Sequence, residues 1–351
     1  MAHWQSPTPD YTTTISKGGW LREVLKSHPD CQSFRILCHH WEMYKTIFPT
    51  GHPQTDNQPN EIDPVGEMTD EERAQKLRLG LQEMNSTINF INSHRFLDIG
   101  CCPGGYSTLV MNICPNSTGM GISLSVPEGG HGLAIPGNLL PRFDLRLEDL
   151  TMFDLAPDWP EKPTLQPVPF TRNTFDLVIC DAHYRQPQPV NDPRPWSCTR
   201  LLISQLLLAL YGVHPGGRIL LTLWRVESPL TAQILLALDR ISTSTHTLKS
   251  PLHEIRPAFY LLALGVQTNV SGYTTIVHAL KKLWCIMTFG GESGQGRDVT
   301  WTEKEMITPW DEVMSPAGLA LIARLGTPVW DVQRNSLLRF LQSQGVGVDM
   351  D

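Results

Sequence analysis

The chain has 351 residues, of which 41% are hydrophobic and 18% are charged, and its formal net charge is −7. This composition fits a globular protein with one large core or two modest ones. It excludes a segment that is apolar enough to span a bilayer, and it offers no basic run for an extended nucleic-acid surface and no C-x-x-C pair for zinc. Because the N-terminus has no apolar core of the signal-peptide kind, we expect an intracellular protein, cytoplasmic or nuclear, with reduced cysteines.

Residues 1–68 are predicted to form an extension of helix and loop. The stretch SFRILCHHWEMYKTIF predicts a helix, and the segment 49–64 is rich in Pro, Gly and Asn, as loops are. Thr69 and Glu72 have the spacing of a capping box. The apolar residues that follow recur three and four positions apart, which predicts an amphipathic helix: Ala74, Leu77, Leu81, Met84 and Ile88.

Residues 69–282 alternate between strand-like and helix-like segments, which predicts an α/β domain with helices on both faces of a mostly parallel sheet. Six strands are expected, at 96–99, 119–124, 144–147, 175–180, 218–223 and 259–266. Helices are expected between them, at about 104–114, 197–212 and 229–241. A weaker strand at 245–248 would pair with the last one as a terminal hairpin, which gives seven strands. The segment 214–217 predicts a turn, and the five prolines of 148–174 predict a surface excursion.

Residues 283–351 open with GGESGQG and close with two helical stretches, SPAGLALIARL and NSLLRFLQS. We expect a helical appendage that packs on the α/β domain, and not a second catalytic domain.

The stretch FLDIGCCPGGYS runs from a predicted strand into a glycine-rich turn. The dinucleotide pattern G-x-G-x-x-G fails at Cys102, and the P-loop pattern fails at Tyr106, where it needs a lysine. An acid, one residue and then G-x-x-P-G-G remain. In this pattern Gly100, Gly104 and Gly105 allow a ligand to approach the backbone closely, and Pro103 suits the first turn of the following helix. The alternative is a tight turn that binds nothing.

This stretch resembles the first motif of the FtsJ-type S-adenosylmethionine-dependent methyltransferases, D-x-G-x-x-P-G-G-[WYF]-[ST]. The resemblance covers roughly residues 70–266, and it implies a Rossmann-like methyltransferase fold with S-adenosyl-L-methionine as cofactor. It places Asp98 near the methionine amino group and Asp149 at the adenine amino group, although either acid can instead cap a turn. At the ribose, where an acid is common, the chain offers only Ser123 and Ser125. The implied cofactor-binding residues are Asp98, Gly100, Cys102, Pro103, Gly104, Gly105, Tyr106, Ser123, Asp149 and Asp181.

Asp181 ends the fourth predicted strand, and the resemblance places it in the catalytic centre. The sequence Asp181-Ala182-His183-Tyr184 is also similar to the [DN]-P-P-Y pattern of amino-group methyltransferases, in which the acid or amide accepts from the amine and the aromatic ring stacks on it. We therefore expect Asp181, His183 and Tyr184 to be catalytic. His183 can act as a base or be an inert exposed side chain.

Two departures from the family pattern bear on the acceptor. The family's lysine in the fifth strand falls on Thr222 and its glutamate in the last strand falls on Ala258, while a further lysine before the first motif corresponds to Lys76 with an imperfect spacing. Arg225 and Glu227 can substitute or lie at the rim. Without the lysine, attack by a sugar hydroxyl should be impaired.

Two hypotheses follow. The first is an active methyltransferase that acts on an O or N nucleophile, with a small-molecule acceptor slightly favoured over RNA 2'-O-ribose. The second is a catalytically silent module that binds S-adenosylmethionine or a partner protein. Neither hypothesis needs a metal or a membrane, and the oligomeric state stays open.

Overall fold

The computed structural model describes residues 17–48, 68–158, 165–183 and 194–346. Seven strands form one sheet in the order β3-β2-β1-β4-β5-β7-β6. The first five strands are parallel, whereas β7 is antiparallel to both of its neighbours. The strands are β1 (Arg95–Ile99), β2 (Thr118–Ser123), β3 (Phe143–Leu147), β4 (Phe175–Cys180), β5 (Val213–Trp224), β6 (Ser244–Leu248) and β7 (Ala258–Leu264). The predicted seven-stranded sheet and its terminal hairpin are confirmed.

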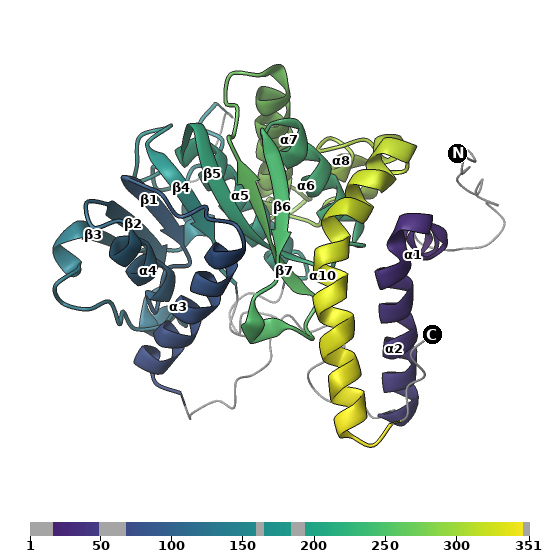
Figure 1. Ribbon diagram of the computed structural model, residues 1–351. Helices are drawn as coiled ribbons and strands as arrows, with labels where there is room; N and C mark the ends of the chain where they lie inside the picture. Colours follow the sequence, from purple (N-terminus) through teal and green to yellow (C-terminus); the bar gives the residue numbers. More distant parts are fainter. Residues whose placement is uncertain (1–16, 49–67, 159–164, 184–193, 347–351) are drawn as a thin grey trace.

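Helices cover both faces of the sheet because successive strand residues point to opposite sides (Figure 1). Phe96, Leu177 and Ile179 belong to one core, together with residues of α3 (Asp70–Thr87) and α4 (Gly105–Ile113). Leu97 and Val178 belong to the other. That second core also includes residues of α5 (Ser197–Gly212), α6 (Pro229–Arg240) and α7 (Ser271–Phe289). The capping box predicted at Thr69 and Glu72 is present at the start of α3.

The expected turn at 214–217 is a bulge inside β5 and not a break before it. Phe175 pairs with Val213 and Leu177 with Arg218, so β5 carries extra residues between two pairs of the ladder. Gly216 has a φ of 82°, and its N–H donates to the Val266 carbonyl oxygen over 2.8 Å. That bond keeps the bulge within the sheet, so β5 begins at Val213.

The N-terminal and C-terminal segments pack against each other. α2 (Gln32–Ile47) and α10 (Pro316–Ser343) lie side by side, with α1 (Lys17–Ser27) at one end of the pair (Figure 1). The Phe34 and Trp330 rings lie 4.8 Å apart between centroids, and those of Tyr44 and Phe340 lie 5.9 Å apart. Residue numbers rise in the same direction along both contacts, so the two helices are parallel. The two helical stretches predicted near the C-terminus are one helix, which continues through Pro328.

α10 also covers the outer edge of β6. Arg324 on α10 donates to the Thr245 carbonyl oxygen over 2.9 Å, and the Thr247 hydroxyl donates to the Leu325 carbonyl oxygen over 2.5 Å. An uncovered edge strand presents unpaired backbone groups to other chains. The helix therefore closes this side of the sheet.

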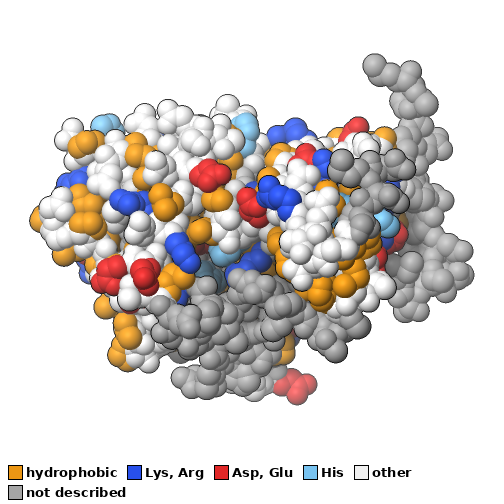
Figure 2. Space-filling view, turned by 60° about the horizontal axis from the view of Figure 1, so that its bottom comes forward, with side chains coloured by type: hydrophobic (Ala, Val, Ile, Leu, Met, Phe, Trp, Pro, Cys, Tyr) orange, Lys and Arg blue, Asp and Glu red, His pale blue; other side chains and the backbone are white. Residues whose placement is uncertain are grey.

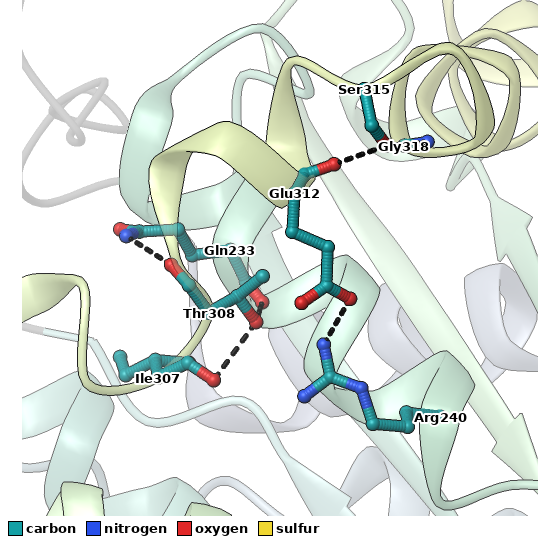
Figure 3. A network of polar contacts seen from close by, with 7 residues as sticks. All are labelled: Gln233, Arg240, Ile307, Thr308, Glu312, Ser315 and Gly318. Carbon is teal, nitrogen blue, oxygen red and sulfur yellow. Dashed lines mark hydrogen bonds and ion pairs between the residues drawn. The ribbon is translucent and has the colours of Figure 1, made fainter.

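A short segment with α8 (Trp301–Lys304) and α9 (Trp310–Val313) ties the C-terminal part to α6. Gln233 donates to the Thr308 carbonyl oxygen over 2.9 Å, and the Thr308 hydroxyl donates back to the Gln233 carbonyl oxygen over 3.0 Å (Figure 3). Arg240 forms an ion pair with Glu312 in the same network. α7, which was not among the predicted helices, runs across residue 282, where we expected a domain boundary.

Trp330→Ala tests whether the helical segments are part of the stable fold. Trp330 is 1% exposed and packs on Phe34, so its truncation should lower the free energy of unfolding by about 3–5 kcal/mol. Urea unfolding measures the change. The control is Leu79→Ala, at a residue that is 50% exposed, which should cost less than about 0.5 kcal/mol. Equal small losses in both variants would show that α2 and α10 do not contribute.

Candidate active site

Asp98 lies near the carboxyl end of β1, and its side chain is 1% exposed. The Ser107 hydroxyl on α4 donates to its Oδ2 over 2.6 Å. Its Oδ1 is buried and has no hydrogen-bond partner among the described residues. Burial raises the pKa of Asp98 to about 7, with Ser107 opposing the shift and Asp181 adding to it. Oδ1 can therefore accept a hydrogen bond. The amino group of the expected cofactor would be a suitable donor.

The turn after β1 presses against the end of β4. Gly100 has a φ of 84°, and a Cβ on it would lie 2.5 Å from the backbone N and Cα of Ala182. The Gly100 N–H donates to the Ile122 carbonyl oxygen over 2.8 Å, and the Asp181 N–H donates to the Ile99 carbonyl oxygen over 2.9 Å. Only glycine fits this position. The backbones of three strands therefore meet where Asp98 and Asp181 lie.

The other two glycines of the turn also make close contacts with protein atoms. A Cβ on Gly104 would lie 2.5 Å from Ile135, and a Cβ on Gly105 would overlap the Ala74 carbonyl oxygen of α3. Gly104 has a φ of 104° and is the residue before α4, so Pro103 precedes the helix and is not in its first turn, contrary to our expectation. Packing accounts for glycine at position 105, and packing together with the positive φ accounts for it at position 104.

The segment 131–135 lies over this turn. The Ala134 N–H donates to the Pro103 carbonyl oxygen over 2.8 Å. Asp70 at the start of α3 accepts from the Gly132 N–H over 2.8 Å, and its other oxygen lies 3.1 Å from the His131 Nδ1. Cys102, whose side chain is buried in the turn, is within reach of Ser123 at the end of β2. These contacts bring the predicted cofactor residues Cys102, Pro103 and Ser123 together.

Asp181 follows β4, and its carboxylate is held by neutral hydroxyls. The Thr222 hydroxyl donates to Oδ1 over 2.5 Å, and the Tyr260 hydroxyl donates to the same oxygen over 3.3 Å. The Tyr260 and Tyr106 hydroxyls lie 2.6 Å apart. We call Thr222, Tyr260 and Tyr106 the hydroxyl cluster. Burial raises the pKa of both tyrosines, so both stay neutral.

The register of β5 and β7 explains why Tyr260 belongs to this site. Thr222 pairs with Tyr260, whereas Ala258 pairs with Trp224. The residue that faces Thr222 is therefore Tyr260, two positions beyond the one we aligned with the family's glutamate. Sequence reasoning overlooked Tyr260 because a register between antiparallel strands is not written in either strand alone. The alternation of side chains along β7 would have identified Tyr260 only if the pairing of β5 with β7 had been known.

Neither Lys249 nor Lys76 pairs with a carboxylate of this site. Lys249, after β6, donates to the Ala258 carbonyl oxygen over 2.5 Å and also to that of Arg256. Its burial lowers its pKa to about 7. Lys76 is exposed on α3, and it forms no ion pair with a described residue. Within the described ranges, no Lys or Arg pairs with the Asp181 carboxylate.

The remaining predicted residues lie around this centre. Asp149 caps a short 3-10 turn by accepting from the Thr151 N–H over 2.8 Å, which is the alternative role that we left open for it. The exposed His183 has its Nδ1 2.9 Å from the carbonyl oxygen of Asp181, not from the carboxylate. Tyr184 lies outside the described residues. Among the residues that the structure covers, no group of three or more His, Cys, Asp or Glu is placed to hold a metal, and no helix is long and apolar enough to cross a membrane.

The lower side of Figure 1, where α3 begins, faces the viewer in Figure 2. On its coloured part, Lys and Arg side chains lie among Asp, Glu and hydrophobic side chains. Mixed charge of this kind differs from the basic stripe of an extended nucleic-acid surface.

The strand order, the reversed β7 and the acids at the ends of β1 and β4 define a Rossmann-like methyltransferase fold. A family model described as FtsJ-like methyltransferase matches residues 78–258, which is more than half of the chain. The chain therefore belongs to the FtsJ-like methyltransferase family, as the first motif indicated.

Solved structures similar to the chain include a candidate ribosomal RNA methyltransferase from Plasmodium falciparum, with 15% identity and a TM-score of 0.37 over 54% of this chain and 96% of that one. Another is a candidate O-methyltransferase from Klebsiella pneumoniae, with 16% identity and a TM-score of 0.35 over 57% of this chain and 92% of that one. These likenesses are too low to carry an argument about the acceptor. No curated protein sequence matches the chain.

Gly100→Ala tests the contact between the turn and β4. The change should destabilise the fold through both backbone strain and overlap with Ala182. The matched control is Gly216→Ala, because Gly216 has a φ of 82° but nothing within 4 Å of the added Cβ. It should cost about 1 kcal/mol from strain alone. Urea unfolding compares the two variants, and equal losses would contradict the close contact.

Asp98→Asn tests the buried carboxyl. The folded-state pKa of about 7 lies above the ordinary value of 3.8, so the folded protein binds the proton more tightly. The resulting stability is present below about pH 4 and is lost as the pH rises toward 7. Relative to wild type, Asp98→Asn should therefore gain stability over this window, by up to about 4 kcal/mol.

Urea unfolding of both proteins at several pH values, without cofactor, measures this difference. Asp311→Asn removes an exposed carboxyl and serves as the control. A difference between wild type and Asp98→Asn that stays constant with pH would show that the pKa of Asp98 is the same in the folded and the unfolded protein.

Proposed function

We propose that the protein transfers a methyl group from S-adenosylmethionine to an O or N nucleophile, with a small-molecule acceptor favoured over an RNA ribose hydroxyl. One observation carries the proposal: Asp98 and Asp181 lie at the ends of neighbouring parallel strands, next to the glycine turn, each with a carboxylate oxygen that has no described donor. In open α/β sheets, ligands bind at this edge.

The residues that would hold the cofactor come from three strand ends. Asp98 would accept from the amino group through Oδ1, Ser123 at the end of β2 would bond the ribose, and Asp149 after β3 would accept from the adenine amino group. When bound, S-adenosylmethionine supplies a methyl group on a positively charged sulfur. Asp181, beside Asp98, would orient the acceptor, since methyl transfer depends mainly on alignment.

The preference against RNA has two supports. A neutral Thr222 hydroxyl contacts Asp181 where the family pattern has a lysine, and no described Lys or Arg pairs with Asp181 to stabilise a developing ribose alkoxide. The net charge of −7 and the mixed charges in Figure 2 also disfavour a polyanion.

The second candidate is a silent module that binds S-adenosylmethionine. The same neutral contacts at Asp181 favour it, because they replace charged groups that the family resemblance makes catalytic. The two candidates share the cofactor site and differ only in turnover.

Asp181→Ala separates binding from turnover. It should leave S-adenosylhomocysteine binding within about twofold, because Asp181 is assigned to the acceptor, and lower methyl transfer by on the order of a hundredfold. Asp98→Ala should abolish binding, and Asp98→Asn repeats this test with the shape of the side chain conserved. Isothermal titration measures binding, and methyl-labelled cofactor with cell extract measures transfer.

Thermal unfolding of each variant provides the control for folding. Absence of heat in the wild-type titration would overturn both candidates. Normal binding by both Asp98 variants would show that the cofactor lies elsewhere. Binding without label in any RNA, protein or small-molecule fraction would favour the silent module.

A further inference from the structure

The site holds two carboxylates close together without a described counter-ion. Asp98 and Asp181 interact electrostatically, since Asp181 helps to raise the pKa of Asp98. In the described ranges neither carboxylate forms an ion pair with Lys, Arg or His. Two neighbouring negative charges favour a positively charged or proton-donating ligand.

The groups around Asp181 are donors that carry no charge. Thr222 and Tyr260 occupy Oδ1, and Tyr106 supports Tyr260 from the face covered by α4. The Lys249 amino group, after β6, is engaged by two backbone carbonyl oxygens. Oδ2 of Asp181 is the oxygen that is left for a ligand.

We propose that the acceptor of this site is an amine, which arrives as an ammonium and donates to Oδ2 of Asp181. The inference rests on the proposed function and names its substrate class. The ammonium would transfer a proton to Asp181, which frees the nitrogen lone pair. That lone pair forms the new N–C bond as the methyl–sulfur bond breaks and its electron pair remains on sulfur, so S-adenosylhomocysteine leaves as a neutral thioether.

A hydroxyl beside phosphates fits the same site poorly. An aliphatic hydroxyl must lose its proton to become a good nucleophile, and a nearby cation is what lowers that cost. A phosphodiester would also bring a negative charge next to Asp181, which has no counter-ion among the described residues. An amine needs neither an alkoxide nor a counter-ion, so the neutral hydroxyl cluster suffices.

The experiment follows the chemical identity of the labelled product. The full chain is incubated with methyl-labelled S-adenosylmethionine and cell extract, and the labelled products are hydrolysed and separated. Label in N-methyl amines supports the inference. Label in 2'-O-methyl ribose or other O-methyl groups overturns it and leaves the proposed function intact. No label in any fraction overturns both.

Thr222→Lys and Thr222→Val provide the second arm. Lysine would pair with Asp181 and compete with the ammonium, so transfer to the labelled amine should fall by about tenfold or more. Valine removes the hydroxyl without adding charge and should cost less. Titration with S-adenosylhomocysteine shows whether each variant keeps the cofactor site. Equal or increased transfer by Thr222→Lys, or equal losses in the two variants, would overturn the inference.

Discussion

The approach of Gly100 to Ala182 is the contact on which the site depends. A Cβ on Gly100 would fall 2.5 Å from the Ala182 backbone, so the turn after β1 and the end of β4 can meet only at a residue without a side chain. Backbone bonds from Gly100 to Ile122 and from Asp181 to Ile99 then fix β1 between β2 and β4. The placement of the two acids is therefore a property of the backbone, and the remaining side chains adjust a geometry that already exists.

This geometry has an electrostatic cost that the protein leaves uncompensated at Asp98. Ser107 supplies one hydrogen bond, but burial and Asp181 together still raise the pKa of Asp98 to about 7. A structural carboxyl would normally be paired or exposed, because an unpaired buried charge destabilises the fold. Strongly shifted groups at the ligand edge of a sheet are typical of functional sites. At Asp181, neutral hydroxyls hold one carboxylate oxygen, and the other has no donor among the described residues.

The sequence predicted those parts of the structure that are encoded locally. Short apolar runs bounded by turns located β1 and β4, the glycine motif located Asp98, and the end of the fourth predicted strand located Asp181. The features that were missed depend on pairing between distant segments. Tyr260 faces Thr222 through the register between β5 and β7, two strands separated in the sequence by α6 and β6. The contact of α2 with α10, such as Ser33 with Asp331, joins residues 298 positions apart. No periodicity within either helix specifies such a partner.

The elements outside the family match complete the site. The match ends at residue 258, the first residue of β7, so Tyr260 lies just beyond it. β7 is held between β5 and β6, and β6 is held on its outer edge by α10 through Arg324 and Thr247. α10 in turn packs on α2. The position of the Tyr260 hydroxyl at Asp181 thus depends on a chain of contacts that reaches both helical segments. Their packing is part of how this chain builds its candidate active site, because a shift of β6 or β7 would move the Tyr260 hydroxyl away from Asp181.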